Sequence, residues 1–338
     1  MNDASAQTTA VLHVGEADTS GPLSGFPVFG PPGALAYVSL AEAVALGAAV
    51  RELETGASVG DVLVHNPLDV GVLLYEGEEI TGAQQDRTFD RSVLVPAGSD
   101  VEVPVSCVEA GRWDGGRHGE AFRSSARAAF PELRRAKGRA ARASGAGRAD
   151  QGEVWGLVHA RAERHGTRSE TGAMGDVFDA RRSAVDSLGA GVVRRDGQIG
   201  AVAVIGGRLC VADVVGRADV FAALHAPLVA GYALDAAEHA TADEVRAIDR
   251  RDALGAAEHA TADEHPAIDR GEIERFLAAV LGAACPADRV GIGLGAHGRF
   301  ATAAAEGARL WHGDELVALT AFALERPASR VRRPSRRR

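Results

Sequence analysis

The sequence predicts an α+β protein in which helices pack against a mainly antiparallel sheet. Short apolar runs alternate with clusters of Gly, Pro, Asp and Asn, as in an antiparallel meander; they lie at Val62–Val64, Val70–Tyr75, Val93–Val95 and Val101–Val108. From about residue 123 onward, helical patterns become more frequent. Strand runs followed by helix runs favour this class over a doubly wound parallel sheet.

The first helical patterns are short and carry recognisable caps. We expect one helix from Ser39 to Val50, with the Ser39 hydroxyl as its N-cap. Residues 123–148 are rich in Ala and Arg, which predicts a helix in their first part, and residues 154–162 predict a second. Another helix is expected from about Val177 to Leu188, with Asp176 as N-cap.

The C-terminal half predicts a hairpin, two helices and two further strands. Ile199–Ile205 and Leu209–Val215 are joined by two glycines and Arg208, and a tight hairpin turn requires such positive-φ residues. Apolar residues at helical spacing follow at 220–232, interrupted by Pro227, and again at 273–281. Short strands are expected near residues 290–294 and 316–322.

We expect one main domain between two loose ends. Residues 1–22 are small and polar and predict a flexible arm, residues 23–325 form the domain, and residues 326–338 predict a disordered Arg-rich tail. Residues 233–250 recur at 253–270, where 15 of 18 aligned positions are identical. We interpret this as a local duplication, exposed and unnecessary for chemistry, because solenoids need about three or more repeats.

Composition excludes several classes of protein. The 338 residues carry a net charge of -9, which argues against a dedicated or sequence-specific nucleic-acid binder. No run approaches the ~20 apolar residues of a membrane span, and no signal peptide is visible, so a cytoplasmic location is expected. The three cysteines are isolated and the histidines are scattered, so no metal site is indicated, and the sequence specifies no cofactor.

Two polar clusters stand out between Gly77 and Trp113. If Val101–Glu109 is a strand, Glu109 continues the same face as Cys107, at the end of a buried row. A carboxylate there must be solvated, paired or functional. Arg112 offers a structural ion pair; the alternative makes Glu109 a general base or a ribose-hydroxyl acceptor. Cys107 is interpreted as a small core residue.

The first of the two polar clusters, GAQQDR at residues 82–87, is rich in groups that suit a nucleotide. Gln85 can contact a ribose or a base edge, because an amide both donates and accepts hydrogen bonds. Arg87 and Arg112 could clamp phosphates. Trp113 could stack on a ring or simply lie at the edge of the core. Exposed loop charges are often only solvated, so a structural reading of these residues stays open.

The two clusters together resemble the signature of the ARPP-1 family, a domain named for its association with ADP-ribosylglycohydrolases and rhodanese-type phosphatases. The first part is a GE-x-x-x-G-x-x-Q-x-R segment, carried by Gly77, Glu78, Gly82, Gln85 and Arg87. The second is CVE-x-GRW, which this chain has at residues 107–113. The family more often has Lys-Gln-Asn at residues 84–86, and this departure weakens any role given to residues 84 and 86.

The resemblance implies that the protein binds or processes an NAD-derived nucleotide such as ADP-ribose. In that interpretation Glu109 and Glu79 are the catalytic acid/base candidates, and the substrate-binding candidates are Glu78, Gln85, Arg87, Arg112 and Trp113. A non-catalytic nucleotide-sensing or interaction module is the alternative, as is a scaffold in which these residues form only ion pairs. ADP-ribosylglycohydrolase or phosphatase partners are implied as well.

Two other features could bind phosphate. GLGAHG at residues 293–298 fits GxGxxG, but the sequence after it does not predict the required helix, so a glycine-rich turn between strands is favoured. Eight basic residues and one acid lie between Arg123 and Arg148. Arg127, Arg134, Arg135 and Arg142 could face phosphate there, although a solvated helix explains them equally simply.

Overall fold

A large antiparallel sheet forms one side of the molecule. The computed structural model describes residues 12–56, 58–145, 147–240, 268–289 and 291–324. In the large sheet the strand order is β1-β3-β13-β14-β17-β16-β15, with β2 paired to β3. Its strands are β1 (His13–Val14), β2 (Asp18–Ser20), β3 (Leu23–Phe29), β13 (Gly200–Ile205), β14 (Arg208–Val215), β15 (Ala296–Ala301), β16 (Ala305–His312) and β17 (Glu315–Ala323).

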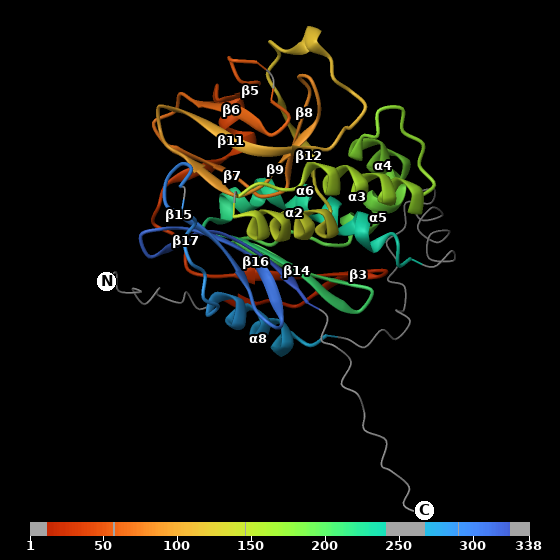
Figure 1. The fold of residues 1–338 in the computed structure, drawn as a ribbon. Coiled ribbons are helices and arrows are strands. Elements are labelled where there is room, and N and C mark those ends of the chain that lie inside the picture. The colour runs from red at the N-terminus through yellow and green to blue at the C-terminus, as the bar shows by residue number, and fades with distance from the viewer. Residues whose placement is uncertain (1–11, 57, 146, 241–267, 290, 325–338) are drawn as a thin grey trace, which may run out of the picture.

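Shorter strands form a second layer, drawn in orange at the top of Figure 1. A six-stranded sheet has the order β12-β8-β9-β11-β6-β5, and a three-stranded sheet has the order β10-β7-β4, in which β4 and β7 are parallel. The strands are β4 (Tyr37–Ser39), β5 (Ala49–Arg51), β6 (Asp61–Asn66), β7 (Gly71–Leu74), β8 (Glu78–Thr81), β9 (Arg87–Phe89), β10 (Val93–Val95), β11 (Ser99–Cys107) and β12 (Arg123–Ala128). Their inward valines and Phe89 make a separate core.

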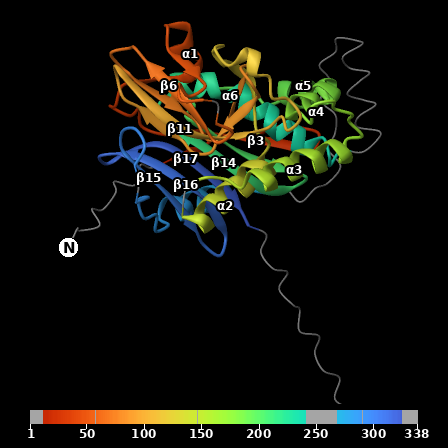
Figure 2. The ribbon, with the colours of Figure 1, turned by 45° about the horizontal axis from the view of Figure 1, so that its top comes forward.

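Helices cover both faces of the large sheet. The α-helices are α1 (Leu40–Ala45), α2 (Pro131–Ser144), α3 (Gln151–Arg164), α4 (Met174–Ala180), α5 (Arg182–Ala190), α6 (Ala218–Ala236) and α8 (Arg270–Leu281), and η1 (Gly115–Arg117) is a 3-10 turn. α6 contacts β13 on one side and β12 on the other, so it lies between the two strand layers, while α8 packs on the opposite face of the sheet. In Figure 2, α2 lies beside β16.

The two-sided cover explains the sequence of β13. Every residue of Gly200–Ile205 is buried. Ala201 and Ala203 join the helix-side core, whereas Val202 and Val204 join the core beneath α8. Alternate side chains point to opposite faces of a strand, so a central strand covered on both faces reads as an uninterrupted apolar run.

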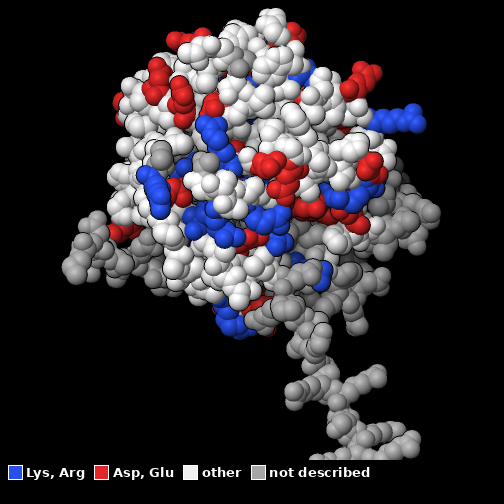
Figure 3. All heavy atoms as spheres, viewed as in Figure 1, with Lys and Arg blue, Asp and Glu red and all other residues white. Residues whose placement is uncertain are grey.

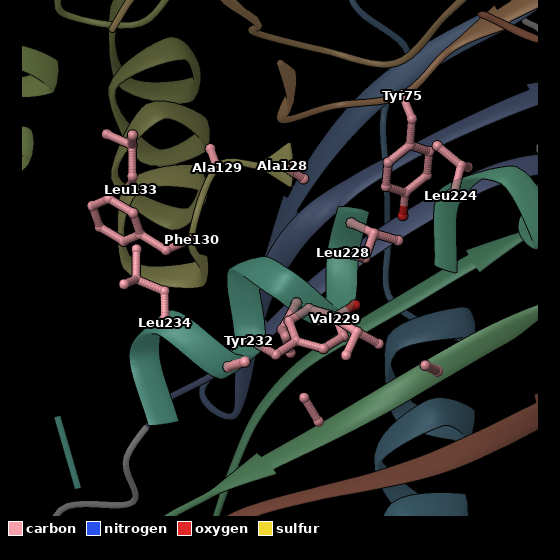
Figure 4. Close-up of a cluster of buried hydrophobic side chains, with 14 of the residues drawn as sticks. Tyr75, Ala128, Ala129, Phe130, Leu133, Leu224, Leu228, Val229, Tyr232 and Leu234 are labelled. Atoms are coloured by element: carbon pink, nitrogen blue, oxygen red, sulfur yellow. The ribbon is translucent and has the colours of Figure 1, made fainter. Parts of the chain in front are cut away.

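A buried polar network ties the layers together. The Asp213 carboxylate on β14 forms an ion pair with Arg134 of α2 at 2.5 Å, and neither side chain is exposed. The Tyr75 hydroxyl, just after β7, donates to Asp213 Oδ1 at 2.8 Å, and the Tyr232 hydroxyl of α6 donates to Asp213 Oδ2. Figure 4 shows both tyrosines within the apolar cluster around α6. One carboxylate therefore connects β7, β14, α2 and α6.

Several sequence predictions are confirmed. The mainly antiparallel α+β class is correct, and Ser39 caps α1 by accepting from the Glu42 N–H. This helix is shorter than predicted, because it ends at Ala45 and Ala49–Arg51 form strand β5. The β13–β14 hairpin turns at Gly206 and Gly207, whose φ angles are 57° and 73°. The glycines at 293–298 lead into β15 rather than into a helix, so the dinucleotide fingerprint is excluded there.

Other predictions are wrong in position or type. Residues 123–128 form strand β12, and the helix begins only at Pro131. The single helix expected from Val177 to Leu188 is two helices, α4 and α5, and the N-cap of α4 is Ala173 instead of Asp176. Residues 291–295 form no strand, although Leu294 makes an isolated bridge to Leu94.

The predicted loose ends and the duplication are described only in part. Within the expected arm, β1 and β2 pair with β3, so residues 13–14 and 18–20 belong to the large sheet. The tail at 326–338 lies outside the described residues. Most of the duplicated segment does so as well, because residues 241–267 are not described.

Candidate functional site

The site is built where the β8–β9 turn and the end of β11 meet the loop that follows α3. The turn between β8 and β9 bends at Gly82, with φ 110°, and at Ala83, with φ 41°. The Val108 N–H donates to the Asp86 carbonyl at 2.9 Å, and the Met174 N–H donates to the Val108 carbonyl at 2.8 Å. These backbone bonds bring together side chains that we call the signature cluster: Glu79, Gln85, Asp86, Glu109, Arg112 and Arg127.

Glu109 is the most heavily bonded carboxylate of the signature cluster. Its Oε2 accepts from Arg112 Nε at 2.7 Å and from the Asp86 N–H at 3.1 Å, and its Oε1 accepts from the Thr171 hydroxyl at 3.0 Å. The residue is 6% exposed. Both oxygens of Glu109 already accept hydrogen bonds, so Glu109 is arranged as an acceptor that holds its neighbours in place.

Glu79 has one oxygen without a partner. Its Oε2 accepts from the Ser125 hydroxyl at 2.5 Å and from Arg127 Nε at 3.0 Å, whereas its Oε1 is buried and makes no hydrogen bond. Burial raises the pKa of the Glu79 carboxyl above its usual value, and the charge of Arg127 opposes that rise. A carboxyl with a raised pKa and a spare oxygen has the properties of a general acid.

Asp86 shares Arg112 with Glu109 and reaches solvent. Its Oδ1 accepts from the Gly82 N–H at 2.8 Å and from Arg112 Nη2 at 2.9 Å. The pKa of Asp86 is raised by burial and by the charge of Glu109, while the Gly82 hydrogen bond and Arg112 act in the opposite direction. The side chains of Asp86 and Arg112 keep 18% and 20% of their exposure, so they form the accessible edge of the signature cluster.

Gln85 lies buried behind Glu109, and Trp113 is exposed next to Arg112 in the chain. Gln85 Nε2 donates to the Glu109 carbonyl at 3.0 Å, and its Oε1 is buried without a partner. Trp113, directly after Arg112, is 49% exposed, so it lies at the surface and not in the core. An exposed indole is a surface on which a flat ring can stack.

The comparisons with known proteins point to one family. The model of the ARG and Rhodanese-Phosphatase-superfamily-associated Protein domain, ARPP-1, matches residues 11–322. The chain belongs to the ARPP-1 family. No curated protein and no solved structure is significantly similar to it. The family name records an association with the ARG and rhodanese-phosphatase superfamilies.

Two of the signature residues of this ARPP-1 domain point into the interior. Arg87 is fully buried, and its Nη2 donates to both Glu52 oxygens at 2.8 and 2.9 Å, while its Nη1 bonds the Ser58 carbonyl. Glu78 accepts from the Tyr75 N–H at 2.7 Å, and burial raises its pKa to about 7. These surroundings are those of structural groups, and the substrate-binding roles of both residues stay predictions.

Cys107 has the character expected of a core residue. It is 0% exposed, and burial raises the pKa of its thiol. Gln151 at the start of α3 clamps its backbone, because Oε1 accepts from the Cys107 N–H at 2.9 Å and Nε2 donates to the carbonyl at 2.8 Å. This clamp joins α3 to the end of β11, and it thereby fixes the strand end that carries Glu109.

The sequence named Arg127 among four arginines that could face phosphate, but it did not pair this residue with Glu79, which lies 48 residues away along the chain. Thr171, whose hydroxyl bonds Glu109 from 62 residues away, was missed, and no local pattern in the sequence points to it. The other three arginines proposed to face phosphate do not join the cluster: Arg134 pairs with Asp213, and Arg135 and Arg142 pair with Glu306.

The described part of the chain has neither a cluster of metal ligands nor a membrane-spanning helix. No group of three or more His, Cys, Asp or Glu side chains there could hold a metal ion. In the same residues, every helix is too short or too polar to cross a bilayer.

Proposed function

We propose that this ARPP-1 domain binds an NAD-derived nucleotide, such as ADP-ribose, at the signature cluster. The observation that carries the proposal is the convergence of Glu79, Asp86 and Glu109 with two guanidinium groups beside an exposed Trp113. Carboxylates accept hydrogen bonds from ribose hydroxyls, and guanidinium groups bind phosphates with two parallel bonds. The family name, which records an association with the ARG superfamily, supports the choice of this nucleotide class.

Each residue is assigned a role in this proposal. Arg112 would contact the diphosphate, because it reaches solvent and holds Asp86 and Glu109 through a guanidinium with five N–H donors. Gln85 would contact ribose or base, and Trp113 would stack on the base. Glu79 is the acid candidate and Glu109 the base or ribose-contact candidate, and Arg127 positions Glu79.

The second candidate function is a nucleotide-sensing or interaction module without turnover. It is favoured by the bonding of Glu109, whose two oxygens already accept from Arg112, Thr171 and the Asp86 N–H. A base that must take a proton has to exchange at least one of those bonds first. Such a module would work with ADP-ribosylglycohydrolase or phosphatase partners, which the family name suggests.

Calorimetric titration with ADP-ribose and with NAD, followed by chromatography of the mixture, tests both candidates. We expect saturable binding that is weakened about tenfold or more in Arg112→Gln, because the change removes a charge-assisted contact worth about 1.5–3 kcal/mol. Arg195→Gln is the matched control, since Arg195 pairs with Asp18 on a different part of the surface. Product formation that Glu109→Gln abolishes indicates an enzyme, and binding without product indicates the sensing module.

Absence of binding would leave the third interpretation, in which the signature cluster is only an ion-pair network. Equal binding of ADP-ribose to wild type and to Arg112→Gln would also favour the ion-pair interpretation, because the nucleotide would then lie away from the signature cluster. Thermal unfolding of each variant must accompany the titration, so that loss of binding is not confused with loss of structure.

A further inference from the structure

The loop between α3 and α4, residues 165–173, lies against the chain segment that carries Glu109. Ala173 forms an isolated antiparallel bridge with Glu109. Two residues further on, the Gly111 N–H donates to the Thr171 carbonyl at 2.6 Å. We call this segment the α3–α4 loop. Its last residues run antiparallel to the CVE-x-GRW motif and extend the strand pairing past the end of β11.

The loop and the motif approach most closely at Gly111. A Cβ at this position would lie 2.9 Å from both the Cα and the carbonyl oxygen of Thr171, a separation that real Cβ atoms do not adopt. Any residue with a side chain at position 111 would therefore push the loop away. Glycine is needed where two backbones approach this closely. The glycine of GRW is thus explained by the approach of Thr171 and needs no contact with a ligand.

Hydrogen bonds within the α3–α4 loop close a short turn around Thr171. The Ser169 hydroxyl accepts from the Ala173 N–H at 2.9 Å and donates to the Asp176 carboxylate of α4. Inside this turn Gly172 has a φ of 65°, in the left-handed region that favours glycine. Thr171 is therefore held in place by the turn on one side and by the motif on the other.

The Thr171 side chain uses this position to bond the Glu109 carboxylate. Its partly exposed hydroxyl donates to Oε1 at 3.0 Å, whereas Oε2 accepts from Arg112 Nε at 2.7 Å and from the Asp86 N–H at 3.1 Å. The last torsion of a glutamate side chain is broad, so a carboxylate that is bonded through one oxygen alone can turn about it. Thr171 therefore restrains the carboxylate that in turn holds the Arg112 guanidinium.

Helix α4, which follows the loop, supports the signature cluster in a similar way. Arg127 donates to Glu79 Oε2 at 3.0 Å, and its Nη1 donates to the Asp179 carboxylate at 3.3 Å and to the Gly175 carbonyl at 3.4 Å. Figure 3 shows acidic and basic side chains interspersed where α3 and α4 lie at the surface, so neither sign of charge dominates there. The segment therefore acts on the cluster through its direct contacts.

We propose that Thr171 is a positioning residue of the signature cluster, an inference that rests on the nucleotide site proposed above. The Thr171 hydroxyl holds Glu109, Glu109 holds the Arg112 guanidinium, and Arg112 contacts the diphosphate. Thr171 itself does not touch the nucleotide. It favours binding because a guanidinium that is already oriented loses less conformational freedom when it meets a phosphate.

Calorimetric titration of the full-length protein with ADP-ribose tests this role through a set of threonine variants. Thr171→Val removes the hydroxyl at nearly constant shape and should weaken binding about fivefold, because Glu109 Oε1 loses its donor. Thr171→Ser keeps the hydroxyl and should bind within about twofold of wild type. Thr171→Ala, which removes the hydroxyl from a smaller side chain, should match Thr171→Val.

Thr167→Val is the matched control. It makes the same chemical change in the same loop, at a buried hydroxyl that has no hydrogen-bond partner in the described part of the chain. Affinity for ADP-ribose should therefore stay at the wild-type value. Equal weakening by Thr167→Val and Thr171→Val would mean that the loop tolerates no valine, and equal weakening by Thr171→Ser and Thr171→Val would mean that the hydroxyl is not what matters. Either result would overturn the role of Thr171.

A double variant shows whether Thr171 acts through Arg112. In the Arg112→Gln background, Thr171→Val should change the affinity for ADP-ribose by less than about twofold, because the group that Thr171 orients is already gone. A further fivefold loss would show that the two effects are independent and would contradict the proposal.

The titrations also separate this inference from the proposed function. Failure of wild type to bind ADP-ribose would overturn the nucleotide site and, with it, the role of Thr171. Saturable binding that Arg112→Gln weakens and Thr171→Val leaves unchanged would overturn the role of Thr171 alone.

Discussion

Two arginine–carboxylate pairs of this protein have the same chemistry and different surroundings. The pair of Arg134 with Asp213 is sealed at the centre, with neither side chain exposed. The pair of Arg112 with Glu109 lies at the end of β11, where the arginine keeps 20% of its exposure. Two tyrosines complete the first pair, and an aspartate, a threonine and a backbone N–H complete the second.

The difference shows how burial divides structural pairs from candidate sites. A sealed pair can only stabilise or destabilise the fold, because no ligand reaches it. A pair with an accessible edge can exchange one of its bonds for a bond to a ligand. Arg87 and Glu52 belong to the first kind, although Arg87 lies in the same sequence motif as Gln85.

The largest expected effect comes from breaking the sealed pair. Asp213→Asn leaves the Arg134 guanidinium buried without a counter-charge, so the free energy of unfolding should fall by about 3–5 kcal/mol. Urea unfolding followed by circular dichroism measures this. Asp196→Asn, at a fully exposed side chain, is the control and should change stability by less than about 0.5 kcal/mol. A loss below about 1 kcal/mol for Asp213→Asn would mean that the network is not a main support of the layers.

The next largest effect is a pH dependence of the free energy of unfolding, which comes from Glu78. Burial raises the pKa of Glu78 from 4.5 to about 7, so the folded state holds this proton more tightly than the unfolded state does. Stability from this group is therefore highest below pH 4.5 and is lost as the pH rises through 7. Glu78→Gln removes the effect and should be more stable than wild type by about 3 kcal/mol at pH 8, with the difference disappearing near pH 4.5. A difference that does not change with pH would contradict the raised pKa.

A smaller effect on stability is expected at the accessible pair. Arg112→Gln removes a partner of Glu109, which keeps its bonds to Thr171 and to the Asp86 N–H. We expect a loss of about 1–2 kcal/mol in the free energy of unfolding, together with the loss of nucleotide affinity. Equal destabilisation by Arg112→Gln and Asp213→Asn would remove the distinction between the two pairs.

The smallest effect on stability is expected at Trp113. Because this side chain is half exposed, Trp113→Phe should change the free energy of unfolding by less than about 0.5 kcal/mol. Binding of ADP-ribose should weaken severalfold, since a smaller ring stacks less well on the base. Unchanged affinity in calorimetry would remove Trp113 from the site.

Local patterns predicted much of the fold but not all of it. The glycine turn of the β13–β14 hairpin, the Ser39 cap and the apolar stripe of α8 depend on residues close together in the chain, and all three are present. Strand β12 was missed because its sequence, RSSARA, has no apolar alternation and is held by pairing with β8. Long-range pairing overrode the helical propensity of the Ala- and Arg-rich stretch.

In the candidate site, pairs between residues close in the chain could be predicted, and pairs between distant residues could not. Glu109 and Arg112 lie three residues apart, so their pairing followed from spacing alone. The pairing of Arg87 with Glu52, 35 residues away, and that of Glu79 with Arg127 depend on how strands are ordered in the six-stranded sheet. The sequence does not reveal this order, so it could not show which arginines are buried.

The most direct test of the signature cluster as a nucleotide site is a nuclear magnetic resonance titration of the labelled protein with ADP-ribose. The account predicts saturable shifts of the Trp113 indole N–H, the Gly111 amide and the Gln85 side-chain amide, with little change around Tyr75 and Tyr232. Shifts confined to other surfaces, or no shifts at ligand concentrations in the millimolar range, would contradict it.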